Sequence, residues 1–109
     1  MVSYFVRYDG QSSSPNSFLE YYRTKHAAIL QQFDEIRNLT IHTPVEWKEP
    51  FLVQKGNVSL LAQMHFDSIE ALNLSLASEA RRRARTDFQN FPKFGGQIIH
   101  QALNAEQIF

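Results

Sequence analysis

Hydrophobic and polar residues alternate along four stretches of the chain, and this period of two predicts β-strands. The four stretches cover residues 2–9, 36–47, 58–66 and 97–103. The clearest is 58–66, where one face carries Val58, Leu60, Ala62, Met64 and Phe66, and the other carries Ser59, Leu61, Gln63 and His65. Pro44 cannot donate a ladder hydrogen bond, so we expect a bulge or a sheet edge in the second strand.

Two further stretches have hydrophobic residues at helical spacing. The first predicts a helix from Pro15 to residue 31 or 32, with Ser14 as its N-cap before a proline at the first helical position. Asp67-Ser68-Ile69-Glu70 has the pattern of a capping box, in which Asp67 caps a second helix and Glu70 reaches back. We expect this helix to be interrupted near Ser78 and to continue over residues 79–90.

The predicted order is strand, helix, strand, strand, helix, strand. This is the ferredoxin-like βαββαβ pattern of the α+β class, and its right-handed crossovers place both helices on one face of a four-stranded antiparallel sheet. The length of 109 residues fits a single domain spanning residues 1–109. The mixed face of residues 58–66 is too apolar for water and too polar for a dry core. We therefore expect a homodimer that closes two such sheets around a lumen able to hold a small molecule.

Composition limits the partners and the chemistry. Hydrophobic residues make up 43% of the chain and charged residues 20%, with a formal net charge of zero and a pI near 6.9. No broad field would attract nucleic acid or an anionic membrane. The absence of cysteine excludes disulfides and thiolate catalysis. Because we also find no secretory signal and no membrane-spanning run, we expect a cytoplasmic protein with neither nucleic acid nor membrane as a partner.

Three segments resemble the EthD-like family in the same order as in that family. They are residues 18–30 (Phe-Leu-Glu-Tyr-Tyr-Arg-Thr-Lys-His-Ala-Ala-Ile-Leu), 61–72 and 85–95. The resemblance implies the dimeric α+β barrel fold and a role in catabolism, since the founding member accompanies a cytochrome P450 system that degrades a fuel ether. Proteins of similar fold include lactone isomerases, dehydratases, cofactor-free oxygenases and haem-handling enzymes. Members often have a proline soon after the helix histidine, whereas this chain has Ala27 and Ala28.

His26 matches the histidine of that family and lies near the centre of the apolar arc of the first helix. It is either a core histidine bonded to a backbone carbonyl or a general acid or base facing a cavity. Asp87 is the candidate that would orient its ring, unless it is a solvated carboxylate paired with Arg82 or Arg83. Tyr22, on the same arc, either donates to a substrate carbonyl or simply packs its ring.

Other residues are candidates for ligand contact. Phe88, Phe91 and Phe94 either form an aromatic lid or fill the core. Gln63 and His65, on the mixed face of the third strand, would contact a ligand in the lumen. The run from Arg81 to Arg85 is flanked by acidic residues, which favours a solvated helix face.

The four histidines lack the spacing of a metal site, so we expect no metal. A haem bound by one histidine remains an alternative at this stage, although the proposed chemistry requires no cofactor. The first hypothesis is a catabolic enzyme, or a helper of one, that performs proton-transfer chemistry on an apolar or aromatic acid, lactone or ketone. The alternatives are a non-catalytic module that binds or delivers a hydrophobic metabolite, and a structural or accessory partner with a filled lumen.

Overall fold

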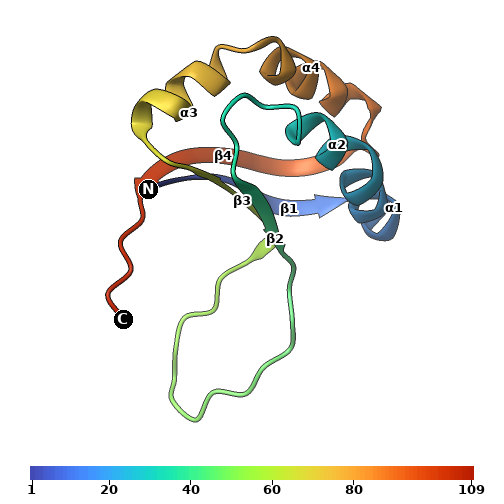
Figure 1. The fold of residues 1–109 in the computed structure, drawn as a ribbon. Helices are drawn as coiled ribbons and strands as arrows, with labels where there is room; N and C mark the ends of the chain where they lie inside the picture. The colour runs from blue at the N-terminus through green and yellow to red at the C-terminus, as the bar shows by residue number, and fades with distance from the viewer.

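Four strands form one antiparallel sheet, and all the helices lie on the same side of it (Figure 1). The computed structural model describes residues 1–109. The strands are β1 (Val2–Ser12), β2 (Asn38–His42), β3 (Val58–Phe66) and β4 (Phe94–Asn104), in the spatial order β2-β3-β1-β4. The ferredoxin-like α+β fold predicted from the sequence is therefore confirmed, with β3 matching its predicted limits.

The register of the strands separates the two faces of the sheet. Tyr4 is opposite Met64 and Val6 is opposite Ala62, and all four of these side chains are buried beneath the helices. The opposite face is polar in part, because Ser3 pairs in register with His65 there. The core therefore lies between the helices and the sheet, and no element of this chain covers the other face, which we call the open face (Figure 1).

The first helical segment extends over residues 15–30, as predicted, but it is not uniform. It consists of α1 (Pro15–Tyr21), a π-helical turn η1 (Tyr22–His26) and α2 (Ala27–Leu30). Pro15 occupies the start of the helix, but the side chain of Ser14 does not cap it. Instead, the carbonyl oxygen of Ser14 accepts a hydrogen bond from the Phe18 amide at 2.9 Å.

The second helical segment is divided into α3 (Ile69–Leu76), α4 (Glu79–Asp87) and a short 3-10 turn η2 (Phe88–Asn90), with the expected break at Ser78. The predicted cap was wrong by one residue. Ser68 is the N-cap of α3, and its Oγ accepts from the Ala71 amide at 3.1 Å. Asp67 instead forms an ion pair with Arg37, which directs its carboxylate away from the helix. No helix has the length and apolar character needed to cross a bilayer.

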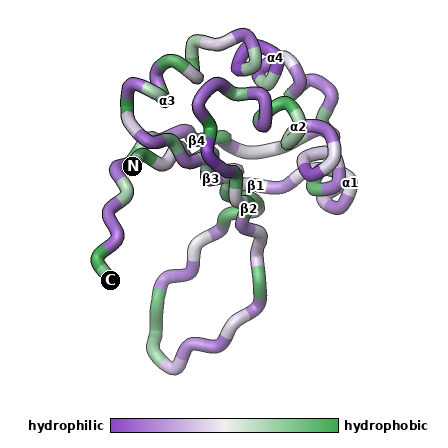
Figure 2. Tube along the Cα trace, in the orientation of Figure 1, coloured by the Kyte–Doolittle hydropathy of each residue, from purple (hydrophilic) through white to green (hydrophobic).

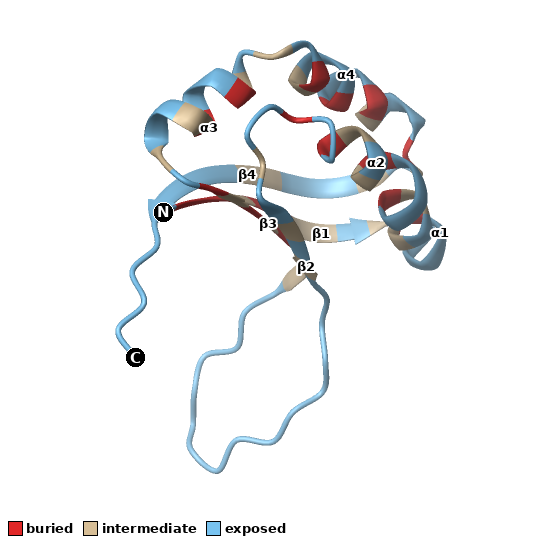
Figure 3. Ribbon diagram, in the orientation of Figure 1, coloured by how far each residue is buried: buried red, intermediate tan, exposed pale blue.

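β2 is much shorter than predicted, because it ends at His42 and residues 43–57 form a loop. Pro44 and Pro50 both lack the amide hydrogen that a longer ladder would need. β2 is an edge strand, as expected for a strand that runs towards a proline. The loop and the tail after β4 project from the sheet on the side away from the helices, and both are exposed (Figures 1 and 3).

Hydrophobic side chains are exposed along this loop and at the end of the tail (Figure 2). They are Val45, Trp47, Phe51, Leu52, Val53, Ile108 and Phe109. Single exposed hydrophobic residues are common, whereas a contiguous group of them is typical of an interaction surface.

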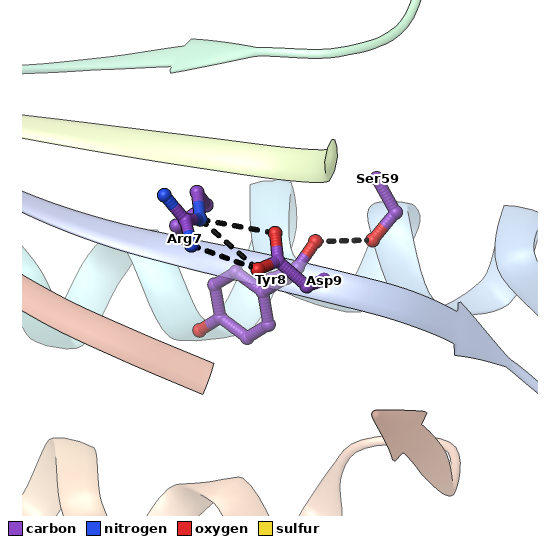
Figure 4. A network of polar contacts seen from close by, with 4 residues as sticks. All are labelled: Arg7, Tyr8, Asp9 and Ser59. Carbon is purple, nitrogen blue, oxygen red and sulfur yellow. Dashed lines mark hydrogen bonds and ion pairs between the residues drawn. The ribbon is translucent and has the colours of Figure 1, made fainter. Parts of the chain in front are cut away.

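β1 is irregular where it passes the start of β3. The register with β3 shifts between Tyr8 and Asp9, and Ser59 Oγ donates to the carbonyl oxygen of Tyr8 at 2.9 Å (Figure 4). On the same strand Arg7 and Asp9 form an ion pair (Figure 4). The hydrogen bond from Ser59 thus joins the two strands at the point where their register shifts.

The β1–β4 pair depends on two glycines that face each other in register, Gly10 and Gly96. Gly96 has φ +150°, and a Cβ there would lie 2.0 Å from the carbonyl oxygen of Asp9. We expect Gly96→Ala to lower the free energy of unfolding by about 1–3 kcal/mol through strain and steric overlap. Urea denaturation measures this. Gly56→Ala is the control, because a Cβ at Gly56 meets nothing within 4 Å. Equal effects of the two substitutions would contradict the prediction.

Candidate functional site

A cavity of about 330 Å³ lies between the sheet and the helices. This volume is in the range of small-molecule sites. Ten of the 14 lining residues are hydrophobic, and the full set is Tyr4, Val6, Tyr8, Tyr22, His26, Leu30, Phe33, Met64, Arg81, Ala84, Arg85, Phe88, Ile98 and His100. The cavity is thus mostly apolar with a few polar groups, which suits a largely hydrophobic ligand.

His26 is the last residue of the π-helical turn, and only 7% of its surface is exposed. Its Nδ1 lies 2.9 Å from Oδ2 of Asp87. A carboxylate only accepts hydrogen bonds, so Nδ1 carries the hydrogen and Nε2 carries the lone pair. No protein group hydrogen-bonds to Nε2. The structure therefore leaves one basic nitrogen available on a side chain that lines the cavity.

Asp87 is the last residue of α4 and is held by three side chains. Besides His26, the Tyr21 hydroxyl donates to Oδ1 at 2.7 Å and the Asn90 Nδ2 donates to Oδ1 at 3.1 Å. Burial alone would raise the pKa of this carboxyl group, but the hydrogen bonds from Tyr21, His26 and Asn90 outweigh burial and lower the pKa. The carboxylate is therefore ionised and fixed in orientation, and it is not the solvated partner of an arginine.

The environment of His26 keeps its ring neutral near pH 7. Burial lowers the pKa of the imidazole below its ordinary value, and the attraction of the Asp87 carboxylate for the charged form only partly opposes this effect. A neutral ring with a free Nε2 can accept a proton. Its proximity to Asp87 also stabilises the imidazolium that would form.

The aromatic candidates are placed differently from one another. Tyr22 and Phe88 line the cavity, with the Tyr22 ring centroid 5.1 Å from that of His26. Phe91 is buried, and its ring centroid lies 4.9 Å from that of His26. The ring centroid of Phe94 lies 5.4 Å from that of Phe18. Phe91 and Phe94 thus belong to the core that supports the site, and only Phe88 of the three is positioned to touch a ligand.

Gln63 and His65 are not brought into the cavity. Both lie on the open face, where Ser3 Oγ is 3.4 Å from Gln63 Nε2 and 3.3 Å from His65 Nδ1. The cavity is on the helix side instead, lined by Met64, which lies between them in sequence. Alternation along β3 places neighbouring side chains on opposite faces. The cavity within one chain therefore lies on the other side of the sheet from these two residues, and a ligand in a lumen between two sheets stays a prediction.

The sequence analysis assigned only His26 of the four polar lining residues to the site. It missed Arg81 and Arg85 on α4 and His100 on β4, as well as the aromatic Tyr4 on β1. The two arginines are four residues apart and flank the buried Ala84, which places them on one helix face. That spacing was the available signal, but the adjacent Arg82 and Arg83 made the whole run look like a solvated surface.

The histidines do not form a metal centre by the usual criterion. No group of three or more histidine, aspartate or glutamate side chains gathers anywhere in the structure. His42 is on β2 and hydrogen-bonds to Gln63, whereas His100 is on β4 and bonds to Tyr4. The histidines therefore have separate surroundings, and only His26 is paired with a carboxylate.

Comparisons with known proteins show the fold. An EthD (ethyl tert-butyl ether degradation) family protein from Bacillus halodurans matches 97% of this chain and 99% of its own, with a TM-score of 0.76 and 19% identity. A dimeric ferredoxin-like protein of unknown function from Thermobifida fusca matches with a TM-score of 0.67 and 9% identity, covering 95% of this chain and 90% of its own. SnoaB, a cofactor-independent oxygenase from Streptomyces nogalater, matches with a TM-score of 0.63 and 15% identity. The match covers 97% of this chain and 93% of SnoaB.

The likeness to an EthD family protein expected from the sequence is thus confirmed at the level of the fold. No family model matches the sequence, and no curated protein matches it either. The identities are all too low to carry residue roles from one chain to the other.

We expect the free energy of unfolding to fall as the pH is lowered from 7 through the pKa of folded His26. The pKa of His26 is lowered by burial, so protonation favours the unfolded chain, whose histidines titrate near about 6.5. The contribution of neutral His26 to stability is complete above the unfolded pKa of about 6.5 and is lost as the pH falls towards the lower pKa of the folded state. Asp87 does not contribute to this decline, because its pKa is lowered below the ordinary carboxyl value.

Denaturation curves between pH 8 and 5 test this dependence in the wild type and in His26→Gln, which should show a weaker decline. His100→Gln is measured alongside, because burial and the nearby arginines also lower the pKa of His100. An NMR titration that places the pKa of His26 above 6.5 would contradict the prediction.

Proposed function

We propose that this protein is a cofactor-free enzyme of small-molecule catabolism in which His26 transfers a proton to or from an apolar or aromatic substrate. The observation that supports the proposal is the buried His26–Asp87 pair, which leaves Nε2 without a protein partner at the edge of an apolar cavity. Ser75 Oγ is the only buried side-chain nitrogen or oxygen without a hydrogen-bond partner, so Nε2 is not sealed inside the protein and is open to a molecule in the cavity.

The reaction proposed is removal of a proton from a carbon beside a carbonyl group. His26 Nε2 takes the proton, the C–H electron pair moves to form an enolate, and the negative charge collects on the carbonyl oxygen. Asp87 stabilises the imidazolium. Tyr22 would donate a hydrogen bond to that oxygen, because burial raises the pKa of its phenol and keeps it protonated. If the enolate is conjugated with a further double bond, His26 returns the proton at the γ-carbon and the double bond shifts, which is an isomerisation. If a hydroxyl group stands on the β-carbon, the C–O bond breaks, the imidazolium gives its proton to the departing oxygen, and water leaves, which is a dehydration.

The fold is compatible with such chemistry, since a cofactor-independent oxygenase shares it. A role in xenobiotic breakdown in the cytoplasm remains a prediction from the sequence resemblance.

Proton exchange at a carbon acid provides a direct test. 2-Tetralone, an aromatic ring ketone, is incubated with the protein in D₂O, and deuterium incorporation is followed by NMR. We expect enzyme-dependent exchange that falls by about 100-fold or more in His26→Gln, in line with the usual contribution of a general base. Asp87→Asn should also reduce exchange, because the ring loses its fixed tautomer.

His42→Gln is the matched control, since His42 is exposed on the open face. It should exchange like the wild type. Exchange that survives in His26→Gln would refute the role of His26. Binding of 2-tetralone without exchange in the wild type would instead favour a non-catalytic binding or delivery module.

We propose in addition that a second copy of the chain covers the open face. Phe5 and Leu61 are half-buried on that face, next to the polar group of Ser3, Gln63 and His65. The exposed hydrophobic residues of loop 43–57 project on the same side (Figure 1). A structural neighbour is described as dimeric, which supports the same arrangement.

A charge placed on the open face should separate the two copies. We expect sedimentation equilibrium to give a dimer for the wild type at micromolar concentration and a monomer for Leu61→Asp, because an unpaired carboxylate would be buried at the interface. Leu74→Asp is the control, since Leu74 is exposed on α3 on the other side of the sheet. A monomeric wild type would refute the dimer without affecting the proposed chemistry.

A further inference from the structure

The cavity has an uncompensated positive charge at one part of its lining. Arg81 and Arg85 both line it, whereas none of the 14 lining residues is acidic. Arg82, on the same helix, is paired with Glu79, but neither Arg81 nor Arg85 forms an ion pair. Asp87, the next carboxylate along α4, is already bound by His26, Tyr21 and Asn90. Two arginines therefore line the cavity without a counter-ion from the protein, Arg81 half-buried and Arg85 exposed to solvent.

Arg81 is held in place by aromatic contacts. Its guanidinium donates to the Tyr4 hydroxyl at 3.3 Å and lies 5.6 Å from the centre of the Tyr4 ring. The same hydroxyl is 2.8 Å from Nδ1 of His100. These contacts fix the position of the Arg81 guanidinium, but they do not neutralise its charge, because neither Tyr4 nor His100 is an anion. Of the two arginines, Arg85 is the freer to contact a ligand, because its side chain forms no hydrogen bond or ion pair within the protein.

We infer that the natural ligand carries a carboxylate, which Arg85 and Arg81 bind while its hydrophobic body fills the apolar part of the cavity beside His26. Arginine suits this task because its planar group bonds to a carboxylate through two parallel hydrogen bonds. His100 adds no charge of its own to the cavity, since burial and the two arginines lower its pKa and favour the neutral ring. The attraction for a carboxylate therefore comes from the two arginines. The inference deepens the proposed function and rests on it for the position of the reacting carbon.

Two probes of nearly equal size test the inference. 2-Naphthoate carries the carboxylate and 2-naphthamide does not, so isothermal titration calorimetry at low salt compares charge at constant shape. We expect the wild type to bind 2-naphthoate at least tenfold more tightly than 2-naphthamide. Arg85→Gln should remove most of that preference while its affinity for 2-naphthamide stays unchanged. Arg81→Gln is a second variant, with its fold checked by circular dichroism because Arg81 contacts Tyr4.

Arg83→Gln is the matched control, because Arg83 is exposed on the same helix and does not line the cavity. It should keep the full preference for 2-naphthoate. Equal binding of the two probes by the wild type would overturn the inference and leave the proposed proton transfer standing. An Arg83→Gln effect as large as that of Arg85→Gln would also overturn it, by showing a general charge effect. Preferred binding of 2-naphthoate, with 2-tetralone exchange insensitive to His26→Gln, would instead refute only the proposed function.

Discussion

The carboxylate of Asp87 is the constraint on which the site depends. It accepts hydrogen bonds from His26 and Tyr21 on the first helical segment and from Asn90 on the second. These segments are far apart in the sequence and cross the same face of the sheet, so one ionised group ties the two helical halves of the fold together. The same contact that joins the halves also fixes the tautomer of His26 and partly opposes the lowering of its pKa by burial.

Much of the fold could be predicted because the local patterns agree with one another. β3 has strict alternation and no proline, and its limits matched the prediction. β2 was predicted too long, since alternation continues past His42 although Pro44 prevents further pairing. The first helix was predicted in extent, but the π-helical turn at Tyr22–His26 left no mark in the hydrophobic pattern. Such turns change hydrogen bonding within a helix more than they change which face is buried.

The candidate site was harder to predict, because periodicity identifies faces but not contacts between them. His26 was found from its position on the apolar arc, and Asp87 was proposed as its partner, yet Tyr21 lies off that arc and its bond to Asp87 had no signal. Alternation in β3 led us to expect the ligand on the mixed face, whereas the cavity within one chain lies on the apolar face. Tyr4 and Tyr8 border that cavity, and alternation alone does not distinguish a face that packs solidly from one that borders open space.

The position of the cavity has a consequence for the assembly. The cavity lies on the helix side of the sheet, opposite the face that a second copy would cover. If two copies associate through the open face, the sheet of each copy stands between its cavity and the contact. Any effect of one subunit on the chemistry of the other would then have to pass through the sheet itself.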